Sequence, residues 1–257
     1  MSTIEQILDR FKPVTLEELD RVKLQNRIDS KFIMSEAELA IVLEGIRPNQ
    51  LVLEIDDKRI FEYKTIYFDT PDFQFFKDHH NGCINRVKVR CREYVDSHLC
   101  FYEIKRKLYG TRTDKQRKVI AELFNEVPDA DYELIEYKRL QNKPIEKKLS
   151  NAFKRITLTN TDFTERITID LGIQFSNGKN SMALDDVVVI EVKQGKTNHF
   201  SNTIQVLKSL GIRPSAFSKY AIGVSLLYPE IKHNNFNPIL RTINKLEHSY
   251  ANNGTDN

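Results

Sequence analysis

The stretch INRVKVRCREY, residues 84–94, decides the fold. Its residues alternate with a period of two, which is the period of a β-strand whose successive side chains point to opposite faces. Val87, Val89 and Cys91 fall on one face. The other face carries four cations and no acid, namely Arg86, Lys88, Arg90 and Arg92. This strand therefore places four positive charges on one surface of a sheet.

Other segments show the same alternation and are rich in β-branched or aromatic residues. They are residues 65–69, 99–107, 115–121, 165–170 and 187–193. Their charged positions again share a face within each segment: Glu103, Lys105 and Lys107; Lys115 and Arg117; Arg166, Thr168 and Asp170; Glu191 and Lys193. We predict six strands as a minimum, each with one charged face.

Two interpretations of these charged faces are open. They form the water-facing side of an ordinary antiparallel sheet, which is the common case for a single strand, or they line the inside of a closed barrel. Like charges on neighbouring strands repel, so a solvated face normally mixes signs. A face with four cations and no acid needs a polyanion to neutralise it, and a barrel would focus its potential. The pattern favours an α+β barrel with helices packed outside.

The sequence also predicts helices that could form this outer layer. Thr15 with Glu18 and Ser35 with Glu38 are capping boxes, each followed by an apolar helical face. The apolar spacing also predicts helices over residues 146–156, 199–210, 215–227 and 239–248. Between these elements we find no linker rich in Pro, Gly or Ser, so the 257 residues are interpreted as one domain.

Composition excludes several classes of function. No stretch is apolar over about 18 residues and the first residues carry acids, which argues against a membrane span or a signal peptide and predicts a cytoplasmic protein. The three cysteines lack the spacing of a disulfide framework or zinc site. The net charge is only +3, so the whole molecule is not a strongly cationic nucleic-acid binder.

The clustered cations indicate a phosphate chain and not DNA as the ligand. Proteins that bind duplex DNA usually present basic residues on an exposed helix or loop, whereas these cations lie in strand alternation. Two acids interrupt the cationic faces, Glu103 and Glu191. Carboxylates at such positions suit a divalent cation that also takes phosphate oxygens, so both are predicted metal ligands.

Six short motifs carry a family resemblance. They are YFDT at 67–70, RCREY at 90–94, EIK at 103–105, KQRK at 115–118, EVK at 191–193 and SKY at 218–220. In this order and spacing the chain resembles the VTC domain, the polyphosphate polymerase domain of vacuolar transporter chaperone complexes and its bacterial relatives. That domain belongs to the triphosphate tunnel metalloenzyme, or CYTH-like, superfamily. The resemblance covers residues 20–227 and leaves 228–257 as a C-terminal helix and tail.

The resemblance implies a closed antiparallel barrel of eight strands, the triphosphate tunnel fold. It implies transfer of the ATP γ-phosphate to a growing inorganic polyphosphate chain, with Mn²⁺ or Mg²⁺ as cofactor and Glu191 as its ligand. A separately encoded membrane protein is a further partner that it allows. The implied catalytic residues are Arg90, Arg92, Lys105, Arg166 and Lys219. The implied phosphate-binding residues are Arg27, Lys31, Lys88, Lys107, Lys115, Arg117 and Lys193.

The chain departs from the superfamily at one motif. Many tunnel enzymes begin with a Glu-x-Glu-x-Lys strand, but here the stretch is RIDSK at 27–31. Asp29 is then either a second metal ligand or a strand-surface acid. The missing paired glutamates argue more against a two-metal hydrolase than against a one-metal transferase. Two alternatives stay open: a hydrolase of tripolyphosphate or nucleoside triphosphates, and a non-catalytic module that binds polyphosphate or inositol polyphosphate.

Overall fold

The computed structural model describes residues 3–22, 27–108, 113–135, 140, 143–195 and 201–253. Its centre is a path of eight strands in which every neighbouring pair is antiparallel. In spatial order the strands are β2 (Arg27–Met34), β11 (Val188–Gly195), β9 (Glu165–Ser176), β8 (Glu146–Asn160), β4 (Phe61–Asp69), β5 (Arg86–Tyr94), β6 (Leu99–Lys107) and β7 (Thr113–Ile120). Three short strands extend this sheet: β3 (Gln50–Leu53) on β8, β1 (Lys12–Val14) on β3, and β10 (Ser181–Leu184) on β9.

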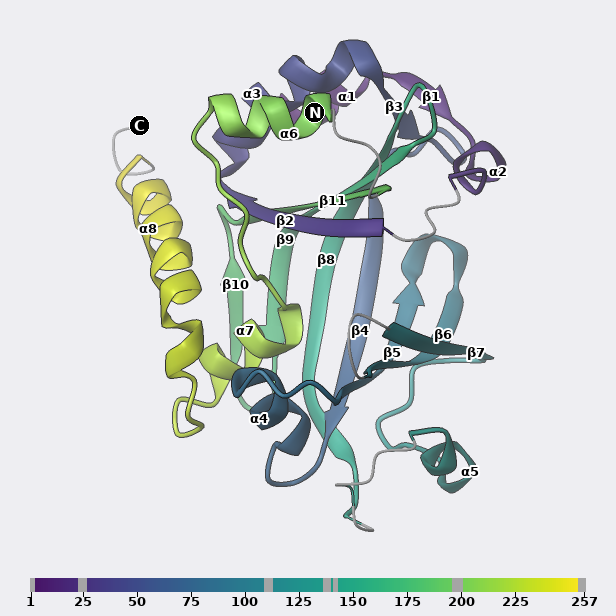
Figure 1. Cartoon of the computed structure of the whole chain (residues 1–257), viewed down its shortest axis with the longest axis vertical. Coiled ribbons are helices and arrows are strands. Elements are labelled where there is room, and N and C mark those ends of the chain that lie inside the picture. Colours follow the sequence, from purple (N-terminus) through teal and green to yellow (C-terminus); the bar gives the residue numbers. More distant parts are fainter. Residues whose placement is uncertain are drawn as a thin grey trace.

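The sheet is strongly curled. In Figure 1, β4, β8, β9 and β10 run vertically, whereas β2 and β5 lie across them. The strands at the two ends of the path, β2 and β7, do not pair with each other within the described part of the chain. The predicted α+β architecture, an antiparallel sheet that curls around a lumen with helices outside, is confirmed. Its hydrogen bonds make a half-barrel and leave the predicted ring open between β2 and β7.

All six strands predicted from alternation are present, as β4, β5, β6, β7, β9 and β11. The helix predicted over residues 146–156 is wrong, because this segment is the first part of β8. Leu149, Phe153 and Ile156 have the i, i+4, i+7 spacing of a helical face, but β8 pairs with both β4 and β9. A register shift between Ala152 and Lys154 disrupts the alternation there. Cross-strand pairing thus overrides the local pattern.

One end of the outer face is covered by three helices, α1 (Thr3–Leu8), α3 (Glu36–Ile46) and α6 (Asn202–Ser209). Leu39, Val42 and Leu43 of α3 are buried in the same cluster as the β9 and β11 side chains. The predicted capping box starts α3: the Ser35 Oγ accepts from the Glu38 backbone N at 3.1 Å, and the Ser35 N donates to the Glu38 carboxylate at 2.8 Å. The four-residue α2 (Leu16–Leu19) has the other predicted box.

Different segments cover the outer face of β4, β5 and β6. Val87, Val89 and Cys91, the apolar face of the decisive strand, pack against the region around α5 (Asp129–Tyr132). The cluster also includes Val127 and Ile145. Because the apolar face of β5 is buried outside, its cationic face must point into the lumen.

Helix α7 (Lys219–Leu227) packs inside the curl, against β8 and β9. A Cβ added to Gly223 would lie 2.5 Å from the Leu149 Cδ2, so the α7 backbone lies directly on the sheet and a larger residue would displace it. Asp69, at the end of β4, fixes α7 and α4 (Gln74–His80): its carboxylate accepts from the backbone N of Phe75 and Phe76 and from the Tyr220 hydroxyl. This anchor places the N-terminus of α7 at the lumen.

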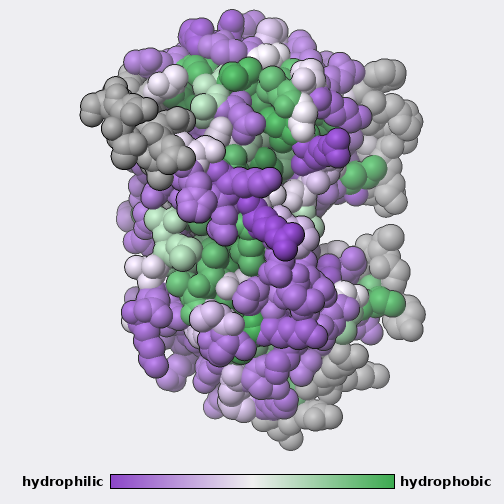
Figure 2. Space-filling model, turned by 90° about the vertical axis from the view of Figure 1, so that its left-hand side faces the viewer, coloured by the Kyte–Doolittle hydropathy of each residue, from purple (hydrophilic) through white to green (hydrophobic). Residues whose placement is uncertain are grey.

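The last helix, α8 (Asn237–Asn253), packs its Ile239 and Ile243 on the α7 side of the core. Hydrophilic residues predominate on the face that carries α8, and a notch interrupts the outline between the upper and lower parts of the molecule (Figure 2). The predicted C-terminal helix is confirmed, and residues 254–257 lie outside the described residues. Among the described helices, none is long and apolar enough to span a membrane.

Candidate functional site

The inside of the curl is a cavity of about 860 Å³. Each of the eight central strands contributes side chains to it, and the start of α7 closes one side. Thirteen lysine and arginine residues and eight aspartate and glutamate residues of the described chain line this cavity. The excess of five positive charges is concentrated in one concave space, so its potential is suited to a polyanion.

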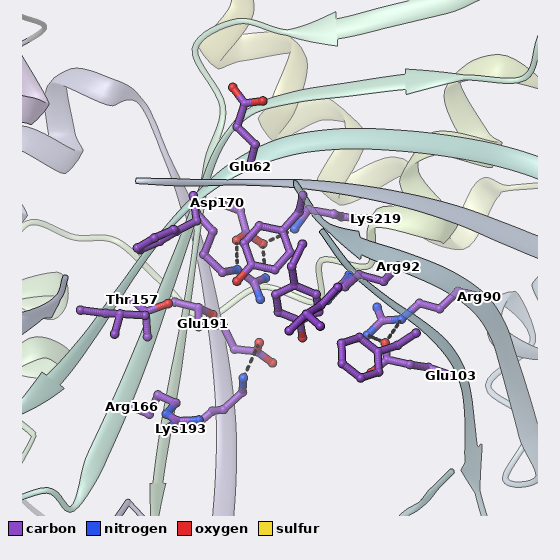
Figure 3. Close-up of a pocket in the computed structure, with 18 of the residues that line it drawn as sticks. Glu62, Arg90, Arg92, Glu103, Thr157, Arg166, Asp170, Glu191, Lys193 and Lys219 are labelled. Carbon is purple, nitrogen blue, oxygen red and sulfur yellow. Dashed lines mark hydrogen bonds and ion pairs between the residues drawn. The ribbon is translucent and has the colours of Figure 1, made fainter. Parts of the chain in front are cut away.

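The structure brings thirteen of the fourteen predicted site residues to this cavity. Lys107 is the exception: it lies opposite Arg86 near the end of β6, outside the residues that line the space. The thirteen that line it are Arg27, Lys31, Lys88, Arg90, Arg92, Glu103, Lys105, Lys115, Arg117, Arg166, Glu191, Lys193 and Lys219. Side chains from widely separated strands converge on one space (Figure 3).

Glu103 organises the cations of β5 and β7. Its carboxylate is 3% exposed and accepts from the Arg90 Nε at 2.7 Å, while its other oxygen lies 2.7 Å from the Lys115 Nζ. Burial disfavours the charged carboxylate, but Arg90 and Lys115 outweigh this effect and lower the pKa of Glu103 to about 2. Both carboxylate oxygens are therefore engaged by side-chain cations. This arrangement suits the positioning of Arg90 and Lys115 better than the predicted metal binding.

Asp170 on β9 is the centre of a second ion-pair group. It is 4% exposed, and the Arg155 guanidinium donates to both its oxygens, at 2.6 and 2.9 Å. The Lys219 Nζ donates to one of the same oxygens. Although burial opposes ionisation, Arg155 and Lys219 lower the pKa of Asp170 well below its usual range. Asp170 thus holds two cations of different elements at one point of the lumen.

Arg155 is a lumen residue that the sequence reasoning missed. The erroneous helix over residues 146–156 concealed it. Arg155, Thr157 and Thr159 alternate with Ile156 and Leu158, and this period of two would have placed Arg155 with the other cations. Asp170 was noted as part of an alternating strand but was left out of the site, because its role depends on Arg155.

Lys219 is positioned by the start of α7. Ser218 is the N-cap, and its hydroxyl accepts from the Ala221 backbone N at 3.4 Å. The Lys219 Nζ also lies 4.2 Å from the centre of the Phe153 ring. Burial lowers the pKa of Lys219 to about 7, since the attraction of Asp170 offsets only part of the cost and Arg155 repels it. Lys219 is therefore only partly protonated at neutral pH in the empty cavity.

This pKa predicts a pH-dependent loss of phosphate affinity. As pH rises through about 7, Lys219 loses its charge, whereas an arginine would keep its charge. We expect Lys219→Arg to bind tripolyphosphate more tightly relative to wild type as pH increases, by roughly tenfold more at pH 8 than at pH 6. Calorimetric titration of both proteins without metal measures this ratio, and the ratio cancels the ionisation of the ligand itself. A ratio that stays constant from pH 6 to 8 would contradict the prediction.

Glu191 lies between two lysines on neighbouring strands. Its carboxylate is 3.2 Å from the Lys193 Nζ and 3.9 Å from the Lys31 Nζ. Burial opposes ionisation, but Lys193 and Lys31 lower the pKa of Glu191 to about 2, so the carboxylate is charged. Asp29 on β2 binds the Arg27 Nε at 3.0 Å and also lines the cavity.

These carboxylates do not form a complete metal cage. The described part of the chain contains no group of three His, Cys, Asp or Glu side chains that could hold a metal ion. Mg²⁺ and similar ions often take only one or two carboxylates and complete their coordination with water and substrate phosphates. Glu191 fits that kind of site because its carboxylate lines the cavity and is partly exposed. Asp29 is already paired with Arg27, which favours its interpretation as a strand-surface acid.

Three cations of the cavity, Lys88, Arg92 and Lys105, have no ion pair with a carboxylate of the described residues. The Lys88 Nζ donates to the Ser218 Oγ at 2.9 Å, and the Arg92 Nε donates to the Thr65 Oγ1 at 3.2 Å. Burial, followed by repulsion from Lys31 and Lys105, lowers the pKa of Lys88 well below its usual value. Burial and Arg90 likewise lower the pKa of Arg92 to about 10. An anion bound beside them would relieve this unfavourable electrostatic environment.

A family model and several solved structures are similar to this chain. The VTC domain family matches residues 26–228. A search of curated proteins finds no match. Similar solved structures include a proposed adenylate cyclase from Vibrio parahaemolyticus, with 12% identity, a TM-score of 0.43 and coverage of 76% of this chain and 96% of that one. They also include a proposed adenylyl cyclase from Hippeastrum with a dominant triphosphatase activity, at 15% identity, TM-score 0.45 and coverage of 77% and 95%.

Proposed function

We propose that this chain, which belongs to the VTC domain family, transfers the γ-phosphate of ATP to the end of an inorganic polyphosphate chain. The cavity supports this proposal by its size, its excess of cations and its lining on all eight central strands. A linear phosphate chain presents a negative charge at each repeat, so it can contact successive strands. The predicted catalytic and phosphate-binding residues that line the cavity are proposed as the groups that bind it.

The lowered pKa values of the buried carboxylates are the observation that favours transfer over hydrolysis. Hydrolysis needs a group that accepts a proton from water, and a suitable base has a pKa near the working pH. The pKa values of Glu103 and Glu191 are lowered to about 2 and that of Asp170 is lowered further. Polyphosphate, by contrast, supplies a terminal oxygen that is already deprotonated. Lys219, the lining group whose pKa is about 7, already donates to Asp170, so an acceptor that needs no base matches this cavity better than water does.

The proposed step is an in-line displacement at the γ-phosphorus. A terminal oxygen of polyphosphate forms the new P–O bond, the bond to the β–γ bridging oxygen breaks, and ADP leaves with that oxygen. Arg90 and Lys115, held by Glu103, and Arg155 and Lys219, held by Asp170, can stabilise charge on the transferred group. Because Glu103 and Asp170 fix these cations before substrate arrives, little reorganisation is needed during the reaction.

Glu191 is the residue we propose to bind the divalent ion, Mn²⁺ or Mg²⁺. When bound, such an ion would neutralise phosphate oxygens and orient them. Lys193 and Lys31 keep Glu191 ionised in its absence, so the carboxylate is ready to exchange a lysine contact for a metal contact.

The test incubates the purified chain with ATP and Mn²⁺ and measures ADP, orthophosphate and polymer in one sample. We expect one phosphate unit to enter long-chain polyphosphate for each ADP that is released. For Glu191→Gln we expect the Mn²⁺ concentration for half-maximal rate to rise roughly 10- to 100-fold. Glu17→Gln, which removes an exposed acid of α2, should match wild type. Orthophosphate without polymer would support the hydrolase instead, and binding of polyphosphate without turnover would support the binding module.

A further inference from the structure

A row of polar residues crosses one end of the outer face of the sheet, away from the lumen. It consists of Gln50 on β3, Asn160 on β8, Glu165 on β9 and Gln194 on β11, and we call it the polar row. Gln50 is opposite Asn160, and Gln194 is opposite Glu165. The Asn160 Oδ1 accepts from the Glu165 backbone N at 2.8 Å. The next residues along the same face are apolar: Val52, Leu158, Ile167 and Val192.

Helix α6 covers the polar row and buries it. Thr203, in the first turn of α6, is fully buried and its hydroxyl donates to the Glu165 Oε1 at 2.8 Å. The Gln50 Nε2 donates to the same oxygen at 3.2 Å. Glu165 is 1% exposed and Gln50 is 2% exposed. A carboxyl group is therefore enclosed between the sheet and a helix.

Three oxygens of the polar row lack a partner. They are the Oε2 of Glu165, the Oε1 of Gln50 and the Oε1 of Gln194, each buried and without a hydrogen bond. No lysine, arginine or histidine of the described residues forms an ion pair with Glu165. Buried polar groups are nearly always hydrogen-bonded, and an unpaired buried charge is more costly still. The three oxygens all accept, so what is missing is a hydrogen-bond donor or a cation.

We propose that Glu165, Gln50 and Gln194 bind an alkali-metal cation, Na⁺ or K⁺, beneath α6. A proton on Glu165 could pair with only one of the other two oxygens, and a water molecule could donate to only two of the three. A cation can contact all three, and hard cations prefer oxygen ligands. The site offers a single carboxylate, so a monovalent ion gives a neutral buried group, whereas a divalent ion would leave a net charge.

The cation would also stabilise part of the lumen. Glu165 precedes Arg166, and Gln194 follows Lys193, so alternation turns these two basic side chains to the opposite face. Arg166 and Lys193 are cross-strand partners and both line the cavity. An ion that joins Glu165 to Gln194 therefore ties β9 to β11 directly behind two phosphate-binding candidates. It also ties both strands to the start of α6 through Thr203.

Thermal unfolding tests the proposal without any reaction. The full chain is unfolded without nucleotide, with a chelator of divalent ions, and choline chloride is replaced by NaCl or KCl at constant ionic strength. We expect the Tm of wild type to rise by roughly 3 to 6 °C when one alkali ion reaches ten times its Kd. Glu165→Gln should lose this rise. Glu230→Gln, which removes an exposed acid, should keep it. Because the experiment measures stability and not turnover, a negative result would count against the cation site and would leave the proposed transferase activity unaffected.

Three outcomes would overturn the cation site. A wild-type Tm that is the same in choline, sodium and potassium chloride shows that no alkali ion binds. If that Tm instead rises as pH falls and Glu165→Gln removes the pH effect, a proton on Glu165 replaces the cation. An equal response of Glu165→Gln and wild type to Na⁺ or K⁺ places the ion elsewhere. If Glu165→Gln does not fold, Gln194→Leu takes its place: loss of the response to Na⁺ or K⁺ supports the site, and a response equal to that of wild type places the ion elsewhere.

Discussion

Replacing Arg90 and Arg92 together by alanine should lower the affinity for tripolyphosphate roughly 10²- to 10⁴-fold. The two guanidinium groups project from the same face of β5 into the cavity, and a hydrogen bond to a charged group contributes about 1.5–3 kcal/mol. Arg92 has no carboxylate partner within ion-pair distance among the described residues, so its full positive charge is available to a bound anion. Calorimetric titration without metal measures this loss, and the rate of ADP formation should fall at least as far.

The matched control is Lys107→Ala. Lys107 belongs to the same hairpin and was predicted from the same pattern, but it does not line the cavity. We expect its affinity to stay within about threefold of wild type, since Lys107 is half-buried outside the cavity and acts on a bound anion only from a distance. Far-ultraviolet circular dichroism checks that the double variant is folded. Unchanged affinity in a folded double variant would exclude the cavity as the phosphate site.

The sequence was informative wherever a strand has one apolar and one charged face. Residues 84–94 showed both that β5 is a strand and that its cations share a side, because period two alone determines both. The same reasoning found Glu191 and Lys193, whose alternation with Val192 is uninterrupted. The positions of these residues in one cavity then follow from the curl of the sheet, which the pattern indicated through the absence of acids on the cationic face of β5.

Three features of the site depend on more than the local sequence pattern. Arg155 was missed because the apolar residues of β8 have helical spacing across a register shift, and only pairing with β4 and β9 determines the strand. Lys107 has the correct parity but lies beyond the cavity, and strand parity does not specify depth along a lumen. Glu103 was predicted as a metal ligand from its type, yet its neighbours in space, Arg90 and Lys115, engage both oxygens.

Paired acids give the lumen its stability as well as its geometry. Thirteen cations in one cavity repel one another, and in the absence of phosphate the eight lining carboxylates offset only part of that repulsion. Glu103 and Asp170 each contact at least two cations and are almost fully buried. Positive charge that no carboxylate neutralises remains at residues such as Lys88, whose pKa is lowered by burial and by its lysine neighbours. A bound polyanion would therefore lower the electrostatic energy of the cavity.

Asp170→Asn should therefore destabilise the empty protein strongly. The amide keeps the shape but removes the charge that Arg155 and Lys219 share. Breaking a buried ion pair by removal of one partner costs about 3–5 kcal/mol, which corresponds to a fall in Tm of roughly 10 °C for a chain of this size. Because the pKa of Asp170 is lowered in the fold, its contribution is complete above the usual carboxyl pKa and is lost only at acid pH. Lys219 has a pKa of about 7 in wild type, and loss of Asp170 lowers it further, so the difference from wild type should be larger at pH 6 than at pH 8.

Tripolyphosphate distinguishes this electrostatic effect from a simple packing defect. In Asp170→Asn the uncompensated cations gain more from a bound anion, so saturating tripolyphosphate should raise the Tm of the variant by more than it raises that of wild type. Asp162→Asn, at an exposed acid, should show neither the loss nor the enhanced recovery. Equal Tm values for Asp170→Asn and wild type without ligand would show that Asp170 does not hold the two cations. A loss that tripolyphosphate recovers no better than in wild type would place its effect in packing and not in charge.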